Sequence, residues 1–155
     1  MTIALRTAAA TDFDEIAAWI VDAHACARWA GPQLPYPLDV RELPNLLAAD
    51  PTTTFVLADG AGEPLAFGQV IQKSPGRFRL ARIIVAPKAR GRGAGRLLCE
   101  SLLEVARSAC ADAADASVSL SVYRDNPAAV SLYTRLGFVE HPPHSAEMLT
   151  LQRRL

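Results

Sequence analysis

The segment from Ile83 to Leu98 constrains the fold more than any other part of the sequence. It reads IIVAPKARGRGAGRLL: an apolar run ends at a proline, and three glycines then open an amphipathic stretch. Leu98, Leu102 and Val105 continue that stretch at helical spacing. Because glycine costs about 1 kcal/mol relative to alanine inside a helix, three glycines in a first turn need a physical reason. The segment predicts a buried strand, a glycine-rich turn and a long helix.

The glycine-rich turn has the chemistry of a phosphate-binding helix start. Unpaired amides at a helix N-terminus point outward, the helix dipole favours an anion, and glycines let a phosphate approach closely. Arg90, Arg92 and Arg96 add positive charge to the turn. Two familiar nucleotide loops do not fit: counted from Gly91, the last glycine of G-x-G-x-x-G falls on Arg96, and G-K-[ST] is absent.

Upstream of this segment, the patterns predict helices followed by a meander of strands. Thr11 is a good N-cap for a helix whose apolar face runs from Ile16 to Ala23. Gly31 and three prolines make Trp29 to Leu38 an extended, stiff loop, and a short helix over Asp39 to Ala49 follows. Turn residues then separate three strand-like runs: Thr54 to Ala58, Leu65 to Gln72 and Arg77 to Ala86.

Downstream, the chain alternates between strands and helices. Ser117 to Tyr123 has strand periodicity, with Val118, Leu120 and Val122 on one face. Asn126 and Pro127 are typical of a helix start and Gly137 of its end. Two last strands follow, Phe138 to His141 and Met148 to Leu151. We therefore predict an α+β fold with one central mixed sheet: an antiparallel N-terminal meander, then strand, helix, strand, helix and strand.

Composition narrows the class of protein. The 155 residues carry no formal net charge, half of them are hydrophobic and 21% are charged, which excludes a disordered chain. We expect one domain over residues 1–155. The balanced charge argues against binding to nucleic acid or an anionic membrane. No apolar run approaches the ~20 residues of a membrane span, and Met1 to Ala10 does not have the pattern of a signal peptide.

The three cysteines indicate neither a disulfide framework nor a metal site. Cys26, Cys99 and Cys110 are an odd set without C-x-x-C spacing or a matching histidine pattern. We expect each to pack as a small hydrophobic residue, and we expect a reducing cytoplasm as the compartment and no bound metal.

Two motifs together resemble the GNAT superfamily of acetyl-coenzyme A-dependent N-acetyltransferases. The first is R-x-x-G-x-G, from Arg90 to Gly95, between an apolar strand and a helix; the second is NPAAVSLYTRLGF, from Asn126 to Phe138. Their order and spacing match the family, and together they cover about Arg82 to His141. The resemblance implies a GNAT-like sheet and acetyl-coenzyme A (acetyl-CoA) as the acetyl-donating cosubstrate.

The resemblance also implies residue roles. The backbone of the strand would lie along the pantetheine arm, the turn would hold the pyrophosphate, Asn126 would contact the cofactor arm, and Tyr133 would point toward the sulfur and protonate the leaving thiolate. The implied cofactor-binding residues are Ile83, Ile84, Val85, Arg90, Gly91, Arg92, Gly93, Ala94, Gly95, Arg96, Asn126 and Tyr133. From the helical spacing, we expect Tyr133 at the edge of the stripe formed by Ala129, Leu132 and Leu136.

The implied function is transfer of an acetyl group from acetyl-CoA to a primary amine by direct attack. The amine, a small molecule or a protein N-terminus or lysine, is not identified by the sequence, nor is the acyl-chain preference. A homodimer is a family analogy. Many relatives that acetylate protein N-termini carry a glutamate that acts as the general base, and Ser121 stands at the matching position here. The general base is therefore open: Glu140, His141, His144, His24, or water held by Ser121. A non-catalytic acyl-CoA sensor is the alternative function.

Two further groups bear on the acceptor. Trp29 and Tyr36 either wall an acceptor pocket or plug the core beneath the loop. Arg77, Arg79 and Arg82 are strand arginines; we expect them to face solvent, with recognition of an acidic acceptor as the alternative.

Overall fold

A computed structural model describes residues 2–48, 52–110 and 114–155. Its seven strands form one sheet in the order β1-β2-β3-β4-β5-β7-β6, in which only β4 and β5 are parallel. The strands are β1 (Ala4–Thr7), β2 (Thr52–Ala58), β3 (Pro64–Ser74), β4 (Arg77–Val85), β5 (Ser117–Tyr123), β6 (Val139–Glu140) and β7 (Met148–Arg154). This is the α+β fold with a central mixed sheet that the sequence predicts.

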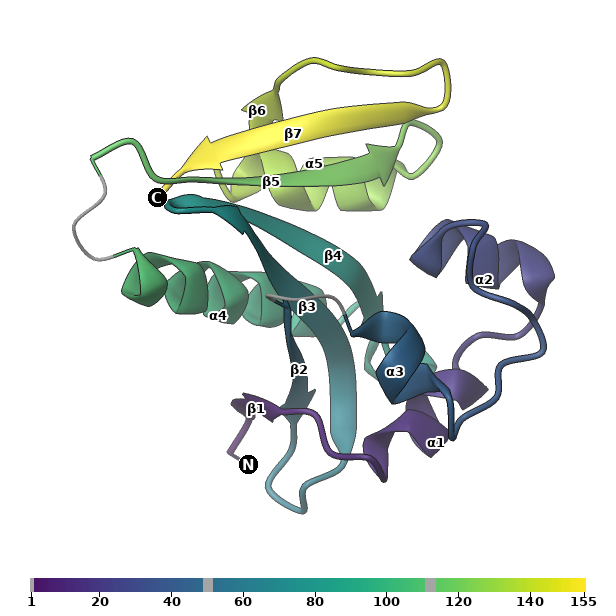
Figure 1. Cartoon of the computed structure of the whole chain (residues 1–155). Helices are drawn as coiled ribbons and strands as arrows, with labels where there is room; N and C mark the ends of the chain where they lie inside the picture. The colour runs from purple at the N-terminus through teal and green to yellow at the C-terminus, as the bar shows by residue number, and fades with distance from the viewer. Residues whose placement is uncertain (1, 49–51, 111–113) are drawn as a thin grey trace.

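Helices cover both faces of the sheet (Figure 1). They are α1 (Asp12–Ala18), α2 (Ala23–Ala30), α3 (Leu43–Leu47), a short 3₁₀ helix η1 (Pro87–Ala89), α4 (Ala94–Ala109) and α5 (Pro127–Arg135). Helices α4 and α5 pack on one face, and α1 to α3 lie on the other. None of the helices within the described ranges is long and apolar enough to cross a bilayer.

Alternation along the meander strands divides the core in two. Val56 and Phe67 are register partners and pack under α1 and α3, whereas their neighbours Leu57 and Ala66 are register partners and pack under α4. Because both faces are covered, residues of both parities are apolar, as in strands buried on two sides. Leu98 and Leu102 of α4 are fully buried against this sheet.

The N-terminal helices differ from the prediction. The single apolar face predicted from Ile16 to Ala23 is split between α1 and α2, with Trp19 as the C-cap of α1. Ile16, Trp19 and Ile20 are all buried nonetheless, so the spacing identified core residues but not the break between the helices. The side chain of Thr11 makes no capping hydrogen bond.

Other boundaries also shift. The second predicted helix shortens to α3, and its last residue, Ala49, lies outside the described ranges. Helix α5 begins and ends as predicted: Asn126 Oδ1 accepts a hydrogen bond from Ala129 N at 3.3 Å, and Gly137 follows with φ 93°. Cys26 and Cys99 are buried, and Cys110, the C-cap of α4, is half-buried and packs against the edge of the core, as expected of small hydrophobic residues.

Candidate active site

The sheet splits open between its two parallel strands. Strand β5 pairs with β4 at only three positions, Arg77 to Arg79 against Ser117 to Ser119. From Leu80 to Val85, β4 has no pairing to β5, and the two strands diverge toward α2 (Figure 1). This stretch therefore offers backbone amides and carbonyls on the β5 side to a ligand that enters the gap.

A bulge in β4 occurs where the strands have separated. The register with β3 shifts between Gln69, opposite Ala81, and Phe67, opposite Ile84, and Arg82 has φ 51°. Positive φ in a non-glycine residue is uncommon. It costs about 1–3 kcal/mol and persists only where the surrounding structure holds it. Here the indole Nε1 of Trp29 donates to the Arg82 carbonyl at 2.8 Å and holds the bulge. Bulges bend a strand and re-aim its side chains.

A cavity of about 530 Å³ fills the gap between β4 and β5. Most of the residues that line it come from α2, β4, β5 and α5 and from the start of α4. Seven predicted site residues are among them: Trp29, Ile83, Ile84, Val85, Gly95, Asn126 and Tyr133. The structure therefore brings the strand, the second motif and one residue of the glycine-rich turn to one cleft, while their contact with a cofactor stays a prediction.

The glycines of the turn serve different structural purposes. Gly91 and Gly93 have φ 73° and 85°, which L-residues rarely adopt, and the space around their missing side chains is open. Gly95 lies within the first turn of α4, where an added Cβ would lie 3.4 Å from Val85 Cγ2. The turn is thus a left-handed bend that leads into α4 beside the cavity, which Gly95 lines. The first turn of α4 lies close to Val85 of β4.

The arginines of the turn surround this helix end. Arg90 donates from Nε to the Val85 carbonyl at 3.1 Å, and Arg96 pairs with Glu100 at 2.7 Å. Arg92 is exposed. Arg90, Arg92 and Arg96, with Gly91, Gly93 and Ala94, lie outside the residues that line the cavity, around the exposed end of α4. That position suits an anion bound at the helix N-terminus.

Tyr133 forms part of the cleft wall. It is the most buried residue of α5, at 8% exposed, and its ring lies edge-on to Phe138 with centroids 5.9 Å apart. The expectation that it lies at the edge of the apolar stripe is wrong: Tyr133 is buried, whereas Ala129, Leu132 and Leu136 are half-buried. Burial raises the pKa of the Tyr133 phenol, so the hydroxyl keeps its proton. Among the described residues it has no hydrogen-bond partner.

The two aromatic residues predicted near the acceptor have different surroundings. Trp29 lies in α2, since the predicted loop begins only at Gly31, and its ring packs on Phe67 with centroids 5.8 Å apart. It also lines the cavity, so it packs on the core and walls the cleft at once. Tyr36 is 38% exposed and does not line the cavity.

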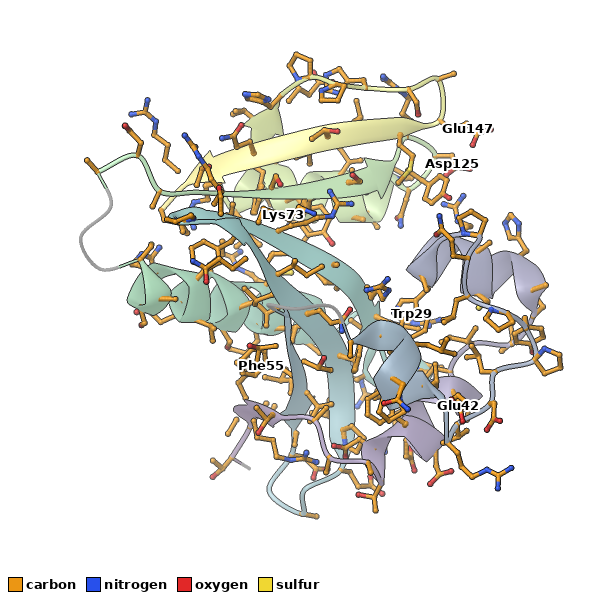
Figure 2. The ribbon with its side chains drawn as sticks, viewed as in Figure 1. Trp29, Glu42, Phe55, Lys73, Asp125 and Glu147 are labelled. Atoms are coloured by element: carbon orange, nitrogen blue, oxygen red, sulfur yellow. The ribbon has the colours of Figure 1, made fainter. Side chains whose placement is uncertain are left out.

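Sequence reasoning did not single out three polar residues: Arg28, which lines the cavity, and Asp125 and Gln69, which lie beside it and contact residues of its lining. Arg28 of α2 pairs with Asp125 at 2.8 Å across the cleft mouth, and its guanidinium lies 4.1 Å from the centre of the Tyr123 ring. Figure 2 shows Asp125 beyond the end of β5, facing α2. Gln69 is fully buried and bonds to Arg82. The sequence could have identified it as a functional candidate, because it is the one side-chain amide within the apolar run from Leu65 to Ile71.

The strand arginines do not all face solvent. Arg77 is exposed at the closed end of β4, as expected, but Arg79 and Arg82 are half-buried and line the cavity. Burial lowers the pKa of both guanidinium groups, and the charge of Arg79 lowers that of Arg82 further. Arg82 lies within the bulge, which turns its side chain toward Gln69, whereas Arg79 precedes the bulge and is directed at Ser121 of the neighbouring strand β5.

The candidate bases lie away from this cleft. Glu140, His141 and His144 are exposed, with His141 Nδ1 2.9 Å from the Pro142 carbonyl and His144 Nδ1 accepting from Thr150 N. His24 lines a separate surface hollow on the far side of Arg28. Ser121 does line the cleft, where its hydroxyl accepts from Arg79 at 3.1 Å. Of these candidates, only a water held at Ser121 has a place in the cavity.

Comparison with known proteins assigns this arrangement to a family. A sequence profile of the Acetyltransferase (GNAT) family matches residues 14–138. The chain belongs to the GNAT acetyltransferase family, which confirms both the predicted family and the predicted fold.

Individual relatives show what the chain is similar to. It is 35% identical over 106 residues to a mycothiol acetyltransferase of Tsukamurella paurometabola, covering 63% of this chain and 35% of that protein. The chain thus spans about a third of the length of this curated relative. Among solved structures, spermidine N-acetyltransferase from Vibrio cholerae in complex with CoA and spermine superposes with a TM-score of 0.79 at 20% identity, covering 98% of this chain and 95% of that one. A GCN5-related N-acetyltransferase from Kribbella flavida superposes with a TM-score of 0.74 at 23% identity, covering 99% and 98%.

Proposed function

We propose that the chain transfers an acetyl group from acetyl-CoA to a primary amine by direct attack. The observation that carries this proposal is the gap between β4 and β5, where unpaired strand backbone, Gly95 in the first turn of α4 and Tyr133 lie around one cavity. The cavity of about 530 Å³ is large enough for the reactive end of the donor and a small amine. Family membership supports acetyl-CoA as the donor.

Each part of the cleft has a role in this reaction. The amides at Ala94 and Gly95 would bind the donor pyrophosphate at the helix end, together with Arg90, Arg92 and Arg96. A backbone amide in Ile83 to Val85 would stabilise the oxyanion that forms as the amine attacks the thioester. Tyr133 would protonate the departing thiolate. Because the amine attacks the thioester directly, the reaction needs no nucleophile from the protein.

The general base is a separate part of the proposal. The cavity lining includes no Asp, Glu or His among the described residues. We infer that the amine enters as the free base or loses its proton to a water held by Ser121. Activity should then rise with pH through the pKa of the acceptor amine.

The absence of Asp, Glu and His from the cavity lining among the described residues also favours the second candidate function, a non-catalytic acyl-CoA sensor. A sensor needs the donor site but no route for the amine proton. Saturable binding of acetyl-CoA without turnover of any amine would support the sensor. A homodimeric state and a cytoplasmic location remain predictions. The sequence predicts no acyl-chain preference; competition between acetyl-CoA and longer acyl-CoA esters measures it.

The first experiment is thermal unfolding with and without acetyl-CoA. At a hundredfold excess over its dissociation constant, the donor should stabilise the fold by about 2.7 kcal/mol and raise the midpoint by about 5–10 °C. NADH and ATP are the controls for general nucleotide binding. An equal shift with the controls, or none with acetyl-CoA, would contradict donor binding and with it the proposed function.

A further inference from the structure

Two arginines that line the cleft, Arg79 and Arg82, have no carboxylate beside them in the part of the chain that the structure describes. The ion pairs among the described residues are elsewhere: Arg6–Asp12, Arg28–Asp125, Arg41–Asp39, Lys88–Glu63, Arg96–Glu100 and Arg107–Glu104. Arg79 bonds only to the Ser121 hydroxyl and Arg82 only to the Gln69 amide oxygen, both neutral acceptors. A guanidinium has five N–H donors, so most of the hydrogen-bonding capacity of this pair is unused.

The environment makes this unpaired charge costly. Both side chains are half-buried, and the two positive charges are close enough that Arg79 lowers the pKa of Arg82. The Arg82 Nε is buried and has no hydrogen-bond partner among the described residues. A buried donor without a partner destabilises the fold, more so when it is charged, and each one in a native structure needs an explanation.

The surrounding structure holds Arg82 in place. Gln69 is fully buried and donates from Nε2 to the Leu47 carbonyl and to Thr54 Oγ1, both at 2.9 Å. Its Oε1 therefore faces Arg82 and accepts from Nη1 at 2.7 Å. The Gln69 amide therefore connects α3, β2 and β3 to the Arg82 guanidinium. Because its two donor bonds fix its orientation, its oxygen holds the guanidinium in one position.

The two arginines lie on the face of the sheet opposite the one that carries α4 and its glycine-rich turn. Leu120 and Val122 of β5 pack into the core beneath α4 and α5, whereas Ser121, which alternates with them, points to the opposite face and receives Arg79. Gln69 and Trp29 place Arg82 on that same face, beneath α2 and α3. The glycine-rich turn lies at the start of α4, on the other face (Figure 1).

We propose that Arg79 and Arg82 bind an oxyanion on the acceptor, so that the substrate is an amine that also carries a carboxylate or a phosphate. This inference rests on the proposed function and specifies its substrate class. A planar guanidinium pairs with either oxyanion through two parallel hydrogen bonds, which would use the free donors and offset the repulsion between the arginines. A polycationic amine would be repelled by the same pair.

The test compares matched acceptors at saturating acetyl-CoA. Amino acids are paired with their carboxamides, O-phosphoethanolamine with ethanolamine, and spermidine represents polycations, all at equal concentrations of free amine. Because charge-assisted hydrogen bonds contribute about 1.5–3 kcal/mol, kcat/KM should favour the anionic member by about 10- to 100-fold. The carboxylate and phosphate pairs tell which oxyanion is bound.

Variants then assign the preference to the arginines. Arg79→Gln and Arg82→Gln should each remove most of the preference, Arg82→Lys should restore part of it, and acetyl-CoA affinity should be unchanged in all three. Arg77→Gln is the matched control, since Arg77 lies on the same strand, is exposed and bonds to Ser117 outside the cleft. A preference for neutral amines or spermidine overturns the inference, as does an anionic preference that survives in both glutamine variants.

Failure of the proposed function gives a different result. If acetyl-CoA does not bind, the proposed function fails. If it binds but no amine is acetylated, equilibrium titration of the acetyl-CoA complex with the same ligands decides the inference. Tighter binding of the anionic members that is lost in Arg79→Gln supports it; equal binding of both members overturns it.

Discussion

Tyr133 is buried and lines the cleft, and the catalytic role proposed for it depends on its hydroxyl alone. Replacing it with phenylalanine keeps the edge-on contact with Phe138 and removes only the proton donor. Since general acid catalysis contributes about 10²–10⁴-fold, we expect kcat of Tyr133→Phe to fall by about a hundredfold or more. Steady-state kinetics measures the fall, and the thermal shift with acetyl-CoA checks that donor binding is intact. Unchanged kcat would mean that Tyr133 packs but does not protonate the thiolate.

The pKa of Tyr133 also predicts the shape of the pH profile. Burial raises this pKa above the ordinary value of about 10, so the phenol stays protonated throughout the neutral and mildly alkaline range. As pH rises, kcat should increase while the amine loses its proton, with no decline from tyrosine ionisation up to about pH 10. A falling limb near pH 9 that disappears in Tyr133→Phe would contradict the buried environment.

At the scale of elements, the turn into α4 separates stability from ligand binding. Gly93 has φ 85°, so Gly93→Ala should destabilise the fold by about 1–2 kcal/mol through backbone strain. Gly95 has helical neighbours, and an added Cβ would meet Val85 at ordinary contact distance, so Gly95→Ala should leave stability unchanged or raise it by up to about 1 kcal/mol.

Donor affinity should follow a different order from stability. Gly95 lines the cavity beside Val85 and a methyl group there would occupy donor space, so Gly95→Ala should weaken acetyl-CoA binding although the fold is no less stable. Urea unfolding and calorimetric titration of both variants measure the two quantities. Equal donor affinity in Gly95→Ala and the wild type would place the donor away from the first turn of α4.

The elements that the sequence predicts well are those whose pattern is local. Strand alternation, the helix α4 and the caps of α5 follow from residues close together in the chain, and the structure has them where predicted. The break between α1 and α2 was missed because Trp19 to Ala23 continues the apolar spacing. The positions of Arg79 and Arg82 in the cleft were missed as well. That of Arg82 depends on a bulge that Trp29 and Gln69 hold from distant parts of the chain, and that of Arg79 on its contact with Ser121 of β5.

Considered as a whole, the molecule ties its N-terminus to the sheet through one buried carboxylate. Arg6 of β1 forms two hydrogen bonds with Asp12 at the start of α1, at 2.7 and 2.9 Å, and a third with the Gly62 carbonyl in the turn between β2 and β3. Asp12 also accepts from Ala9 N at 2.7 Å, a bond that holds the chain just before α1. Arg6 therefore links three segments, β1, the start of α1 and the turn between β2 and β3, and the side chain of its partner Asp12 is 6% exposed.

This arrangement predicts an acid-sensitive contribution to global stability. The hydrogen bond from Arg6 lowers the pKa of Asp12, so its stabilising effect is complete above the unfolded value of about 3.9 and is lost as pH falls through the lower folded value. Asp12→Asn should reduce the free energy of unfolding by about 1–2 kcal/mol at pH 7, since Arg6 is partly exposed. The difference from wild type should shrink as pH falls below about 4 and vanish once Asp12 is protonated in both states. Asp39→Asn is the control, because its pair with Arg41 is exposed and 3.8 Å long. Urea unfolding from pH 7 to pH 3 measures the difference, and a constant gap between wild type and Asp12→Asn across that range would mean that shape at Asp12, and not its charge, joins the three segments.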